Sequence, residues 1–430
     1  MQNVYRKQIM PKAELICVQT DKFKTGCLSV TLISRLSKKT ASLNAVLPRV
    51  LRRGTSSYPD MESIASALDD LYGAHIEPFV RKKGENQLVG FISDFVDDYY
   101  IDGEDSILES VANLMGEMLL SPNTFSGRLR SEYVNSEREQ LIDEINAAIN
   151  DKIQYSVTRL VEQMCSQEAY GINKLGTAQT AAKISVATLT KQYRELLASS
   201  EIRFFYCGSA DFERVELAVM SAFSALPRKM PPLDTGTDIL LDPVKKNVRN
   251  FTDELDVTQG KLSIGFRLGE TMAHPNYAAI MVFNALYGGS VNSKLFLNVR
   301  EKLSLCYYAS SMIEKHKGIM IVYSGIEFDK FETAKNEILA QLEAVKNGEF
   351  EKWELDSAKR SVINSLKTIS DQMGRLEDFY LDYDLIGIPC TPEDLAAIAE
   401  SVSEEEIIKI ASCIKTDSVY FLKGADRNDG

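Results

Sequence analysis

The sequence is poor in histidine, with only His75, His274 and His316 among its 430 residues. No two of them lie one helical turn apart, as the imidazole ligands of a helical zinc site do. The 7 cysteines form no C-x-x-C pair, and their odd number argues against a disulfide framework. We therefore expect neither a metal centre nor a disulfide scaffold, and unpaired thiols favour a reducing, cytoplasmic setting.

Long apolar runs are also absent. No stretch of about 18 apolar residues occurs, so we expect no membrane span, and the first 20 residues lack the continuous apolar segment of a secretory signal. A formal net charge of −12 disfavours a general nucleic-acid surface, which needs a basic face. With 44% apolar residues, the chain can bury large cores and should divide into about two to four domains.

The two halves of the chain repeat each other. GCLSVTLISRL (26–36) alternates like a strand and is echoed by GKLSIGFRLGE (260–270). A helix is predicted after each, over residues 42–53 and over NYAAIMVFNALYGG (276–289). This duplication indicates two homologous units.

Each half closes on a similar strand, RFFYCGSADF (203–212) or SVYFLKGADR (418–427). We predict an α+β fold of two homologous halves, each a largely antiparallel β-sheet with helices packed on one face. Residues 1–227 would form the first domain, the Pro- and Asp-rich residues 228–250 a linker, and residues 251–430 the second domain.

Two prolines mark predicted helix starts. Pro59 suits the first turn of a helix over residues 57–73, which Gly73 would end. Pro48 is compatible with the helix over residues 42–53 only if that helix starts near Asn44 and keeps the proline in its first turn.

GGSVNSKLFLNVREKLSLCYY (288–308) combines a glycine turn, an amphipathic helix carrying Arg300, and a strand carrying Tyr307. A guanidinium and a phenol placed together can donate hydrogen bonds to a peptide carbonyl or to the oxyanion it becomes. By residue type alone, the same side chains are also typical of a solvated helix end and a half-buried strand.

The stretch resembles the C-terminal half-motif of the pitrilysin/insulinase family of zinc metallopeptidases, which includes the mitochondrial processing peptidases. Arg300 and Tyr307 match the family's Arg and Tyr. In that family these residues hold the substrate backbone near the zinc, often from the domain that does not bind the metal. The resemblance covers nearly the whole chain and implies subunits of two such halves, paired around a peptide-sized chamber.

Residues 47–74 resemble the family's zinc-motif segment. Alignment on Gly54 and Thr55 places the inverted motif H-x-x-E-H on Ala45, Pro48 and Arg49. A catalytic zinc site needs imidazole ligands and a carboxylate that activates water. None of these groups is present at the three positions, so the resemblance implies a degenerate metal site that binds no metal.

The family's third ligand is a helical Glu, and SEREQLIDEINAAINDK (136–152) resembles that helix, with Glu137 and Glu144 at its two acidic positions. Arg49 precedes Glu144 by 95 residues, a wider gap than is usual in the family, which an insertion near residues 95–105 would explain. We hypothesise that Arg49 fills the vacant site and pairs with Glu144, because an inward carboxylate needs a partner once the metal is lost.

Residues 38–54 are locally basic. They fit a solvated helix end, or a positive patch in the degenerate site that could hold acidic or C-terminal groups of a peptide.

The combined pattern predicts a non-catalytic subunit of a two-chain zinc peptidase. It would bind no cofactor itself and would be inactive alone. Arg300 and Tyr307 would contribute to peptide binding and oxyanion stabilisation in the active site of a homologous partner that carries H-x-x-E-H and the zinc.

Two alternatives stay open at this point. One is a peptide-binding or scaffold homodimer with no peptidase role. The other is a self-sufficient enzyme of altered chemistry that uses Glu137, Glu144 and a cysteine or His75. The second is disfavoured because no nucleophile and base occur in a recognisable arrangement.

Overall fold

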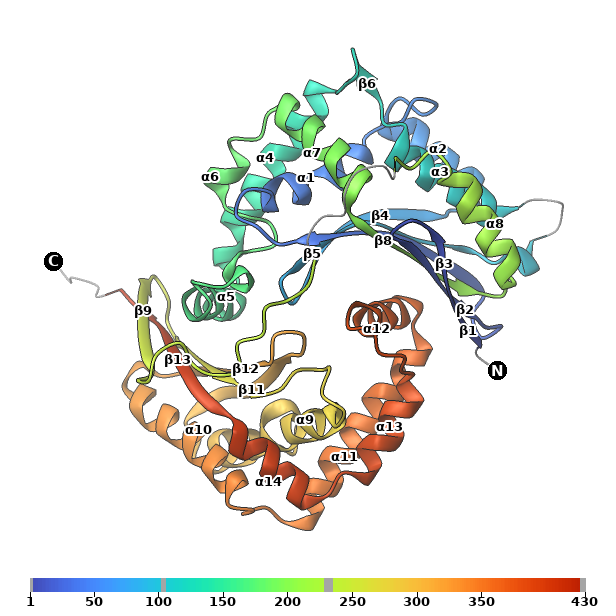
Figure 1. Cartoon of the computed structure of the whole chain (residues 1–430). Coiled ribbons are helices and arrows are strands. Elements are labelled where there is room, and N and C mark those ends of the chain that lie inside the picture. The colour runs from blue at the N-terminus through green and yellow to red at the C-terminus, as the bar shows by residue number, and fades with distance from the viewer. Residues whose placement is uncertain (1–2, 102–105, 228–234, 426–430) are drawn as a thin grey trace. The chain divides into compact units, whose positions relative to one another are not determined.

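The chain folds into two compact units in a computed structural model (Figure 1), which describes residues 3–101, 106–227 and 235–425. Unit 1 comprises Met1–Asn146, Ile172–Gly236 and Met373–Leu381, and unit 2 comprises Ala147–Gly171, Thr237–Gln372 and Asp382–Gly430. Two segments, 147–171 and 373–381, therefore lie with the unit that the other half of the chain builds, an exchange that the predicted division at residues 228–250 does not include.

Each unit is built on one main β-sheet. The six strands of unit 1 lie in the order β1 (Asn3–Met10), β2 (Ala13–Gln19), β8 (Glu201–Gly208), β3 (Thr25–Arg35), β5 (Asn86–Val96) and β4 (His75–Lys83). The five strands of unit 2 lie in the order β11 (Cys306–Glu314), β12 (Ile319–Ile326), β10 (Gly260–Arg267), β13 (Lys415–Gly424) and β9 (Arg249–Leu255).

The two sheets share one topology. Among the described strands, β2 pairs in parallel with β8 and β9 in parallel with β13, and the other neighbours in both main sheets are antiparallel. In each unit the closing strand thus lies beside a strand from the start of its own half. The predicted duplication and the largely antiparallel sheets are confirmed, although residues 426 and 427 of the last predicted strand lie outside the described residues.

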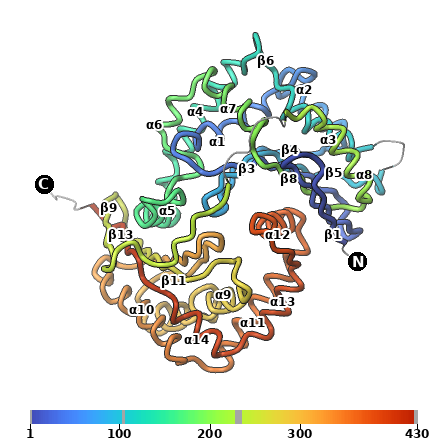
Figure 2. The backbone as a smooth tube through the Cα atoms, viewed as in Figure 1, coloured from blue at the N-terminus to red at the C-terminus, as the bar shows by residue number. Residues whose placement is uncertain are grey.

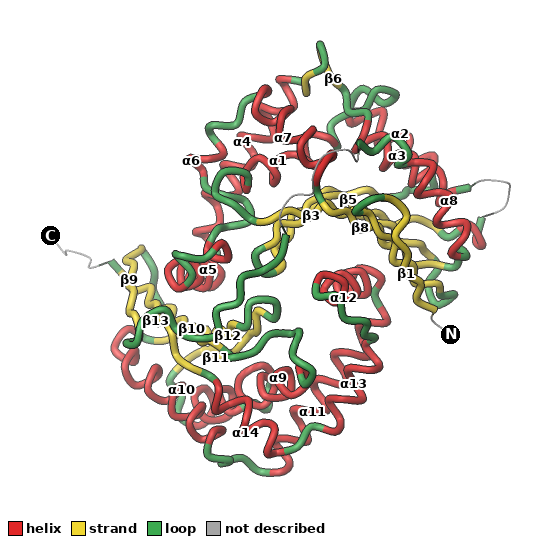
Figure 3. The backbone as a smooth tube through the Cα atoms, viewed as in Figure 1, coloured by secondary structure: helices red, strands yellow, loops and turns green. Residues whose placement is uncertain are grey.

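One face of each sheet carries the main helical layer (Figure 3, helices in red and strands in yellow). In unit 1 the helices beside the sheet are α1 (Ala41–Leu51), α2 (Met61–Asp70), α3 (Ile107–Leu120), α4 (Ser131–Ala147), α6 (Ala178–Ala181), α7 (Val186–Ser199) and α8 (Phe212–Ala222). In unit 2 they are α9 (Tyr277–Asn284), α10 (Phe331–Lys346), α11 (Lys352–Lys367), α13 (Pro392–Ser401) and α14 (Glu404–Cys413). Each helix that the structure describes is too short or too polar to span a lipid bilayer.

Strand alternation explains the helical layer of unit 1. Leu28, Val30 and Leu32 of β3 are at most 2% exposed and join the core beneath the helices, while Ser29 between them points to the other face. The helix predicted from residue 57 begins later than expected. Asp60 caps α2 through the Ser63 amide at 2.8 Å, so Pro59 precedes the helix and is not in its first turn.

The second face of each sheet carries an exchanged helix, which the prediction of helices on one face did not include. In unit 2, α5 (Lys152–Met164) contributes to an apolar cluster with β12 and β13, and its Ser156 hydroxyl lies 3.0 Å from that of Ser263. In unit 1, the first part of α12 (Met373–Leu385) lies against β3 and β4. Figure 2 shows both helices beside strands distant in sequence.

Ion pairs hold α12 to the unit 1 sheet. Glu377 is 1% exposed, accepts a hydrogen bond from the Ser29 hydroxyl at 3.2 Å and pairs with Arg81 of β4. Lys83 pairs with Asp378 at 2.7 Å. Burial raises the pKa of Glu377 and the Arg81 charge opposes that rise, so the guanidinium stabilises the carboxylate in this dry position.

A buried ionic network holds the segment that follows α5 to the unit 2 sheet. Glu168 lies 2.6 Å from Arg267 of β10 and 2.9 Å from Lys317. Arg267 also donates from Nε to Asp417 of β13 at 2.9 Å, and neither of these two side chains is exposed. Burial acts to raise the pKa of Glu168, but the charges and hydrogen bonds of Arg267 and Lys317 hold it below its usual value.

Replacement of Asp417 by Asn should destabilise the protein by about 3–5 kcal/mol, because it leaves the buried Arg267 without one of its two compensating carboxylates. Urea unfolding measures this cost. The matched control is Glu343→Gln, which removes an exposed partner of Lys346 at 2.9 Å and should cost about 0.5 kcal/mol or less. Equal costs for the two variants would show that the network does not stabilise unit 2.

Candidate functional site

The degenerate metal motif lies on α1 of unit 1. Ala45 is fully buried in the core, Pro48 is buried, and the Arg49 side chain is 24% exposed. The helix begins at Ala41 rather than near Asn44, so Pro48 lies in its interior, and the expectation of a first-turn proline is wrong. Proline has no amide hydrogen and cannot donate to the carbonyl of Asn44, yet packing of the apolar face keeps the helix continuous.

Arg49 of α1 and Arg53 in the turn after it pair with the two predicted carboxylates of α4. Arg49 donates to Glu144 at 2.5 Å, and Arg53 donates to Glu137 at 3.2 Å. The predicted pairing of Arg49 with Glu144 is confirmed. Glu144 is 47% exposed, so solvent screening leaves its pair little effect on stability, whereas Glu137 is 7% exposed and its pair is better shielded.

The groups on α1 do not fit a zinc ion. The three motif positions offer a methyl group, a pyrrolidine ring and a guanidinium, and none of these can coordinate a metal cation. In the part of the chain that the structure describes, no group of three or more His, Cys, Asp or Glu side chains is arranged to hold a metal ion. The carboxylates that would complete such a site are bonded to arginine instead.

A small cavity of about 80 Å³ lies beside this pair and brings in a residue that the sequence did not indicate. It is lined by Arg49, Glu144 and Lys174, with apolar walls from α1, β4 and Leu175. Desolvation lowers the pKa of Lys174, Glu144 opposes that lowering, and the charges of Arg81 and Arg49 add to it. Lys174 lies far from α1 in sequence, so no local pattern pointed to it.

Arg300 and Tyr307 lie in unit 2 on irregular backbone. Arg300 is in a π-helical segment, Leu295–Lys302, at whose end the Leu303 amide donates to the carbonyl of Asn298, five residues earlier. Tyr307 is the extra residue of a β-bulge. Cys306 pairs with Ile326 of β12 and Tyr308 pairs with the adjacent Gly325, so Tyr307 has no partner of its own in the pairing. π-Helical turns and bulges recur at functional sites because they redirect side chains.

Both side chains line one cavity of about 490 Å³, together with Glu327 and Lys330. The Tyr307 side chain is exposed, and its hydroxyl donates to Glu327 at 2.6 Å. That hydrogen bond raises the pKa of Tyr307, and because an ordinary tyrosine is already neutral at physiological pH, the phenol is a neutral donor here. The Arg300 guanidinium lies 4.6 Å from the Phe296 ring centroid, within the range of a cation–π contact.

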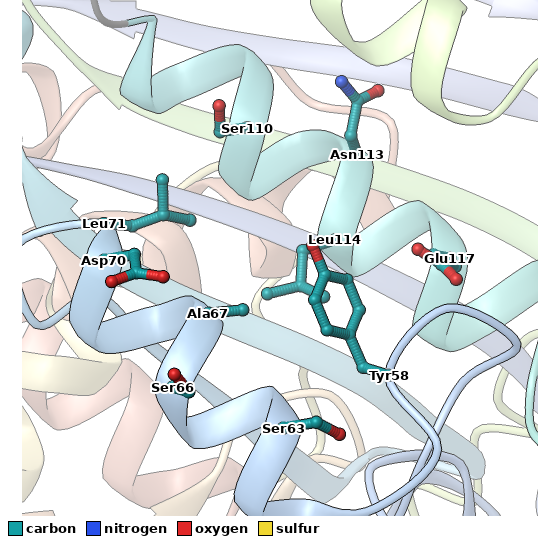
Figure 4. Close-up of a pocket in the computed structure, with 10 residues that line it drawn as sticks. All are labelled: Tyr58, Ser63, Ser66, Ala67, Asp70, Leu71, Ser110, Asn113, Leu114 and Glu117. Atoms are coloured by element: carbon teal, nitrogen blue, oxygen red, sulfur yellow. The ribbon is translucent and has the colours of Figure 1, made fainter.

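A third cavity, of about 530 Å³, lies in unit 1 between α2 and α3 (Figure 4). Its walls are mostly serines and apolar residues, with Asp70 and Glu117 as the acidic members. Glu117 accepts hydrogen bonds from Thr55, Ser56 and the Ser57 amide, so it caps the loop after α1. None of the predicted site residues lies here.

Comparison with known proteins shows the family. Residues 183–362 match the model described as "Peptidase M16 inactive domain". The chain is 34% identical over 410 residues, 95% of each chain, to the "Probable inactive metalloprotease YmfF" of Bacillus subtilis (strain 168). The chain belongs to the peptidase M16 family. This confirms the predicted resemblance to the pitrilysin/insulinase peptidases, and the chain is a member of the inactive kind, without the zinc motif.

Solved structures show the same fold. A conserved protein from Enterococcus faecalis V583 superposes with a TM-score of 0.90 at 26% identity, covering 99% of this chain and 100% of that one. A peptidase M16 inactive domain from Pseudomonas fluorescens gives a TM-score of 0.79 at 16% identity over 98% of both chains. The M16 fold thus extends over the whole chain.

Replacement of Pro48 by Ala should raise the free energy of unfolding by about 1–2 kcal/mol. The alanine restores an amide donor in the middle of α1, a gain only partly offset by greater freedom of the unfolded chain. Urea unfolding measures the change. Pro392, in the first turn of α13, is the matched control, because proline is favoured there and Pro392→Ala should bring no gain. A destabilised P48A protein would show that the proline ring packs better than this account allows.

Proposed function

We propose that this M16 protein is the non-catalytic subunit of a two-chain zinc peptidase. Arg300 and Tyr307 would bind the peptide substrate in an active site whose zinc is held by the H-x-x-E-H motif of a homologous partner subunit. The observation that carries the proposal is the contrast between the units: unit 2 keeps both donors around one cavity, while unit 1 has Ala45, Pro48 and Arg49 at the metal positions.

The two donors have the chemistry that this role requires. A guanidinium presents up to five N–H groups, and a neutral phenol presents one strong O–H donor. Both side chains reach solvent, with Arg300 at 40% and Tyr307 at 62% exposure. Donors aimed at a scissile carbonyl stabilise the charge that develops on its oxygen more than they stabilise the ground state.

Local contacts keep the donors available. The nearest carboxylate to Arg300 is that of its chain neighbour Glu301, at 3.5 Å, which is a weak and solvent-exposed contact. Tyr307 would exchange Glu327 for the substrate carbonyl, trading one hydrogen bond for another. A peptide backbone can therefore engage both groups at modest cost.

A homodimer that binds peptides or serves as a scaffold is the competing role. It also accounts for the lost metal residues, but it has no use for an oxyanion donor pair. Substitution of Arg300 and Tyr307 together distinguishes the two roles, because it should lower the rate of peptide hydrolysis only if the two side chains act in a peptidase active site.

The decisive experiment is reconstitution of the chain with the H-x-x-E-H subunit that co-purifies with it, followed by peptide hydrolysis assays. The double variant Arg300→Ala, Tyr307→Phe should lower kcat/KM by about 10²-fold or more, with subunit association unchanged, since loss of one oxyanion donor costs about 10²–10³-fold. The matched control is Lys302→Ala, which removes an exposed cation two residues from Arg300 and should leave kcat/KM within about twofold.

Unchanged kcat/KM in the double variant would overturn the donor role and favour the scaffold. An equal loss with Lys302→Ala would mean that general charge on this helix, rather than the donor pair, affects activity.

A further inference from the structure

The cavity beside Arg49 carries more positive than negative charge. Two cations, Arg49 and Lys174, face one carboxylate, Glu144. Of the Arg49 donors, one is engaged, by Glu144. Across residues 3–101, 106–227 and 235–425, no hydrogen bond or ion pair engages the Lys174 ammonium. Free N–H donors and a net charge of one positive unit make this cavity a place for a monovalent anion.

The loop that carries Lys174 is rigidly placed. Gln87 of β5 donates to the Lys174 carbonyl at 2.5 Å, and Ser42 of α1 donates to the Leu175 carbonyl at 3.0 Å. Gly176 follows with φ +74°, and a Cβ there would lie 2.0 Å from the Ser42 hydroxyl, so only glycine fits this turn. The backbone at Lys174 is therefore fixed beside α1 before any ligand arrives, and binding has to order only the lysine side chain.

We propose that this cavity binds a carboxylate, with the C-terminal carboxylate of a peptide as its ligand. The group would lie between Lys174 and the free N–H groups of Arg49, in the place where the family's metal motif has been lost. The inference does not depend on the proposed function, because it requires only this chain.

The surroundings favour a peptide carboxylate over phosphate. The cavity volume of about 80 Å³ exceeds the roughly 10–15 Å³ that one water needs, so a carboxylate fits. Glu144 would repel the second charge of a phosphate dianion. Phe79, Val80 and Leu175 form an apolar wall beside the charges, which suits the side chain of an apolar C-terminal residue.

Binding of N-acetyl-leucine by the full chain tests the proposal, with saturation-transfer NMR titrations in low salt as the measurement. We expect a dissociation constant on the order of millimolar, as is typical of a ligand of this size. N-acetyl-leucinamide, which lacks the charge, should bind at least tenfold more weakly. N-acetyl-aspartic acid α-amide reports a side-chain carboxylate, and inorganic phosphate reports the dianion; both should bind more weakly than N-acetyl-leucine.

Variants locate the site. Lys174→Met should weaken N-acetyl-leucine binding about tenfold or more, and Lys191→Met, at an exposed lysine of α7, is the matched control with no expected change. Glu144→Gln should tighten binding several-fold, because it removes the like charge and releases Arg49. Opposite signs for two partly exposed residues separate a binding role from general destabilisation.

Three results would overturn the proposal. Equal binding of the amide would show that the apolar wall alone holds the ligand. Unchanged binding by Lys174→Met would place the ligand elsewhere. Tighter, Lys174-dependent binding of phosphate or of the aspartyl side chain would show a different anion specificity.

Discussion

A fixed positive charge at Arg49 is the constraint on which the account of this protein depends. In the zinc peptidases that the chain resembles, this helix position provides a metal ligand. A guanidinium cannot lose its proton under physiological conditions and cannot coordinate a cation. Its bond to Glu144 joins α1 to α4, and the bond of Arg53 to Glu137 joins the turn after α1 to the same helix. Direct ion pairs thus connect the two segments that would provide the metal ligands.

Without a metal site, the chain still has two places where side chains could bind a ligand. Unit 1 contains a small cavity where the two positive charges of Lys174 and Arg49 exceed the one negative charge of Glu144. Unit 2 carries the donor pair on two irregular pieces of its backbone, a π-helical turn at Arg300 and a bulge at Tyr307. Irregular backbone costs stability, so its presence at both donors argues for use of these side chains rather than for chance.

Local pattern was sufficient for much of the fold. The alternation of residues 26–36 and 260–270 predicted β3 and β10, and the duplicated order of elements predicted two similar sheets. The exchange of α5 and α12 could not be predicted, because it depends on buried charges such as Glu168 and Glu377 meeting partners far away in sequence. Pro48 was misplaced for a related reason: tertiary packing overrides the local cost of an interior proline.

Some residues of the candidate sites could likewise be predicted from the sequence, and others could not. The match to the family's motif positions predicted the pairing of Arg49 with Glu144 in spite of the unusually wide gap between them. It also predicted that Arg300 and Tyr307 lie close together, and both line one cavity. Lys174 and Glu327 have no motif, since each reaches its cavity through tertiary structure. The bulge that exposes Tyr307 depends on strand register, which the tyrosine pair itself does not encode.

Whether this chain works beside a zinc-binding partner can be measured by native mass spectrometry of the complex that it forms in its own cells, combined with metal analysis of each separated subunit. We expect one copy of this chain with one copy of a homologous subunit that carries H-x-x-E-H, and one zinc ion that stays with that partner. A chain that elutes only with itself, or zinc that stays with this chain after separation, would contradict this expectation.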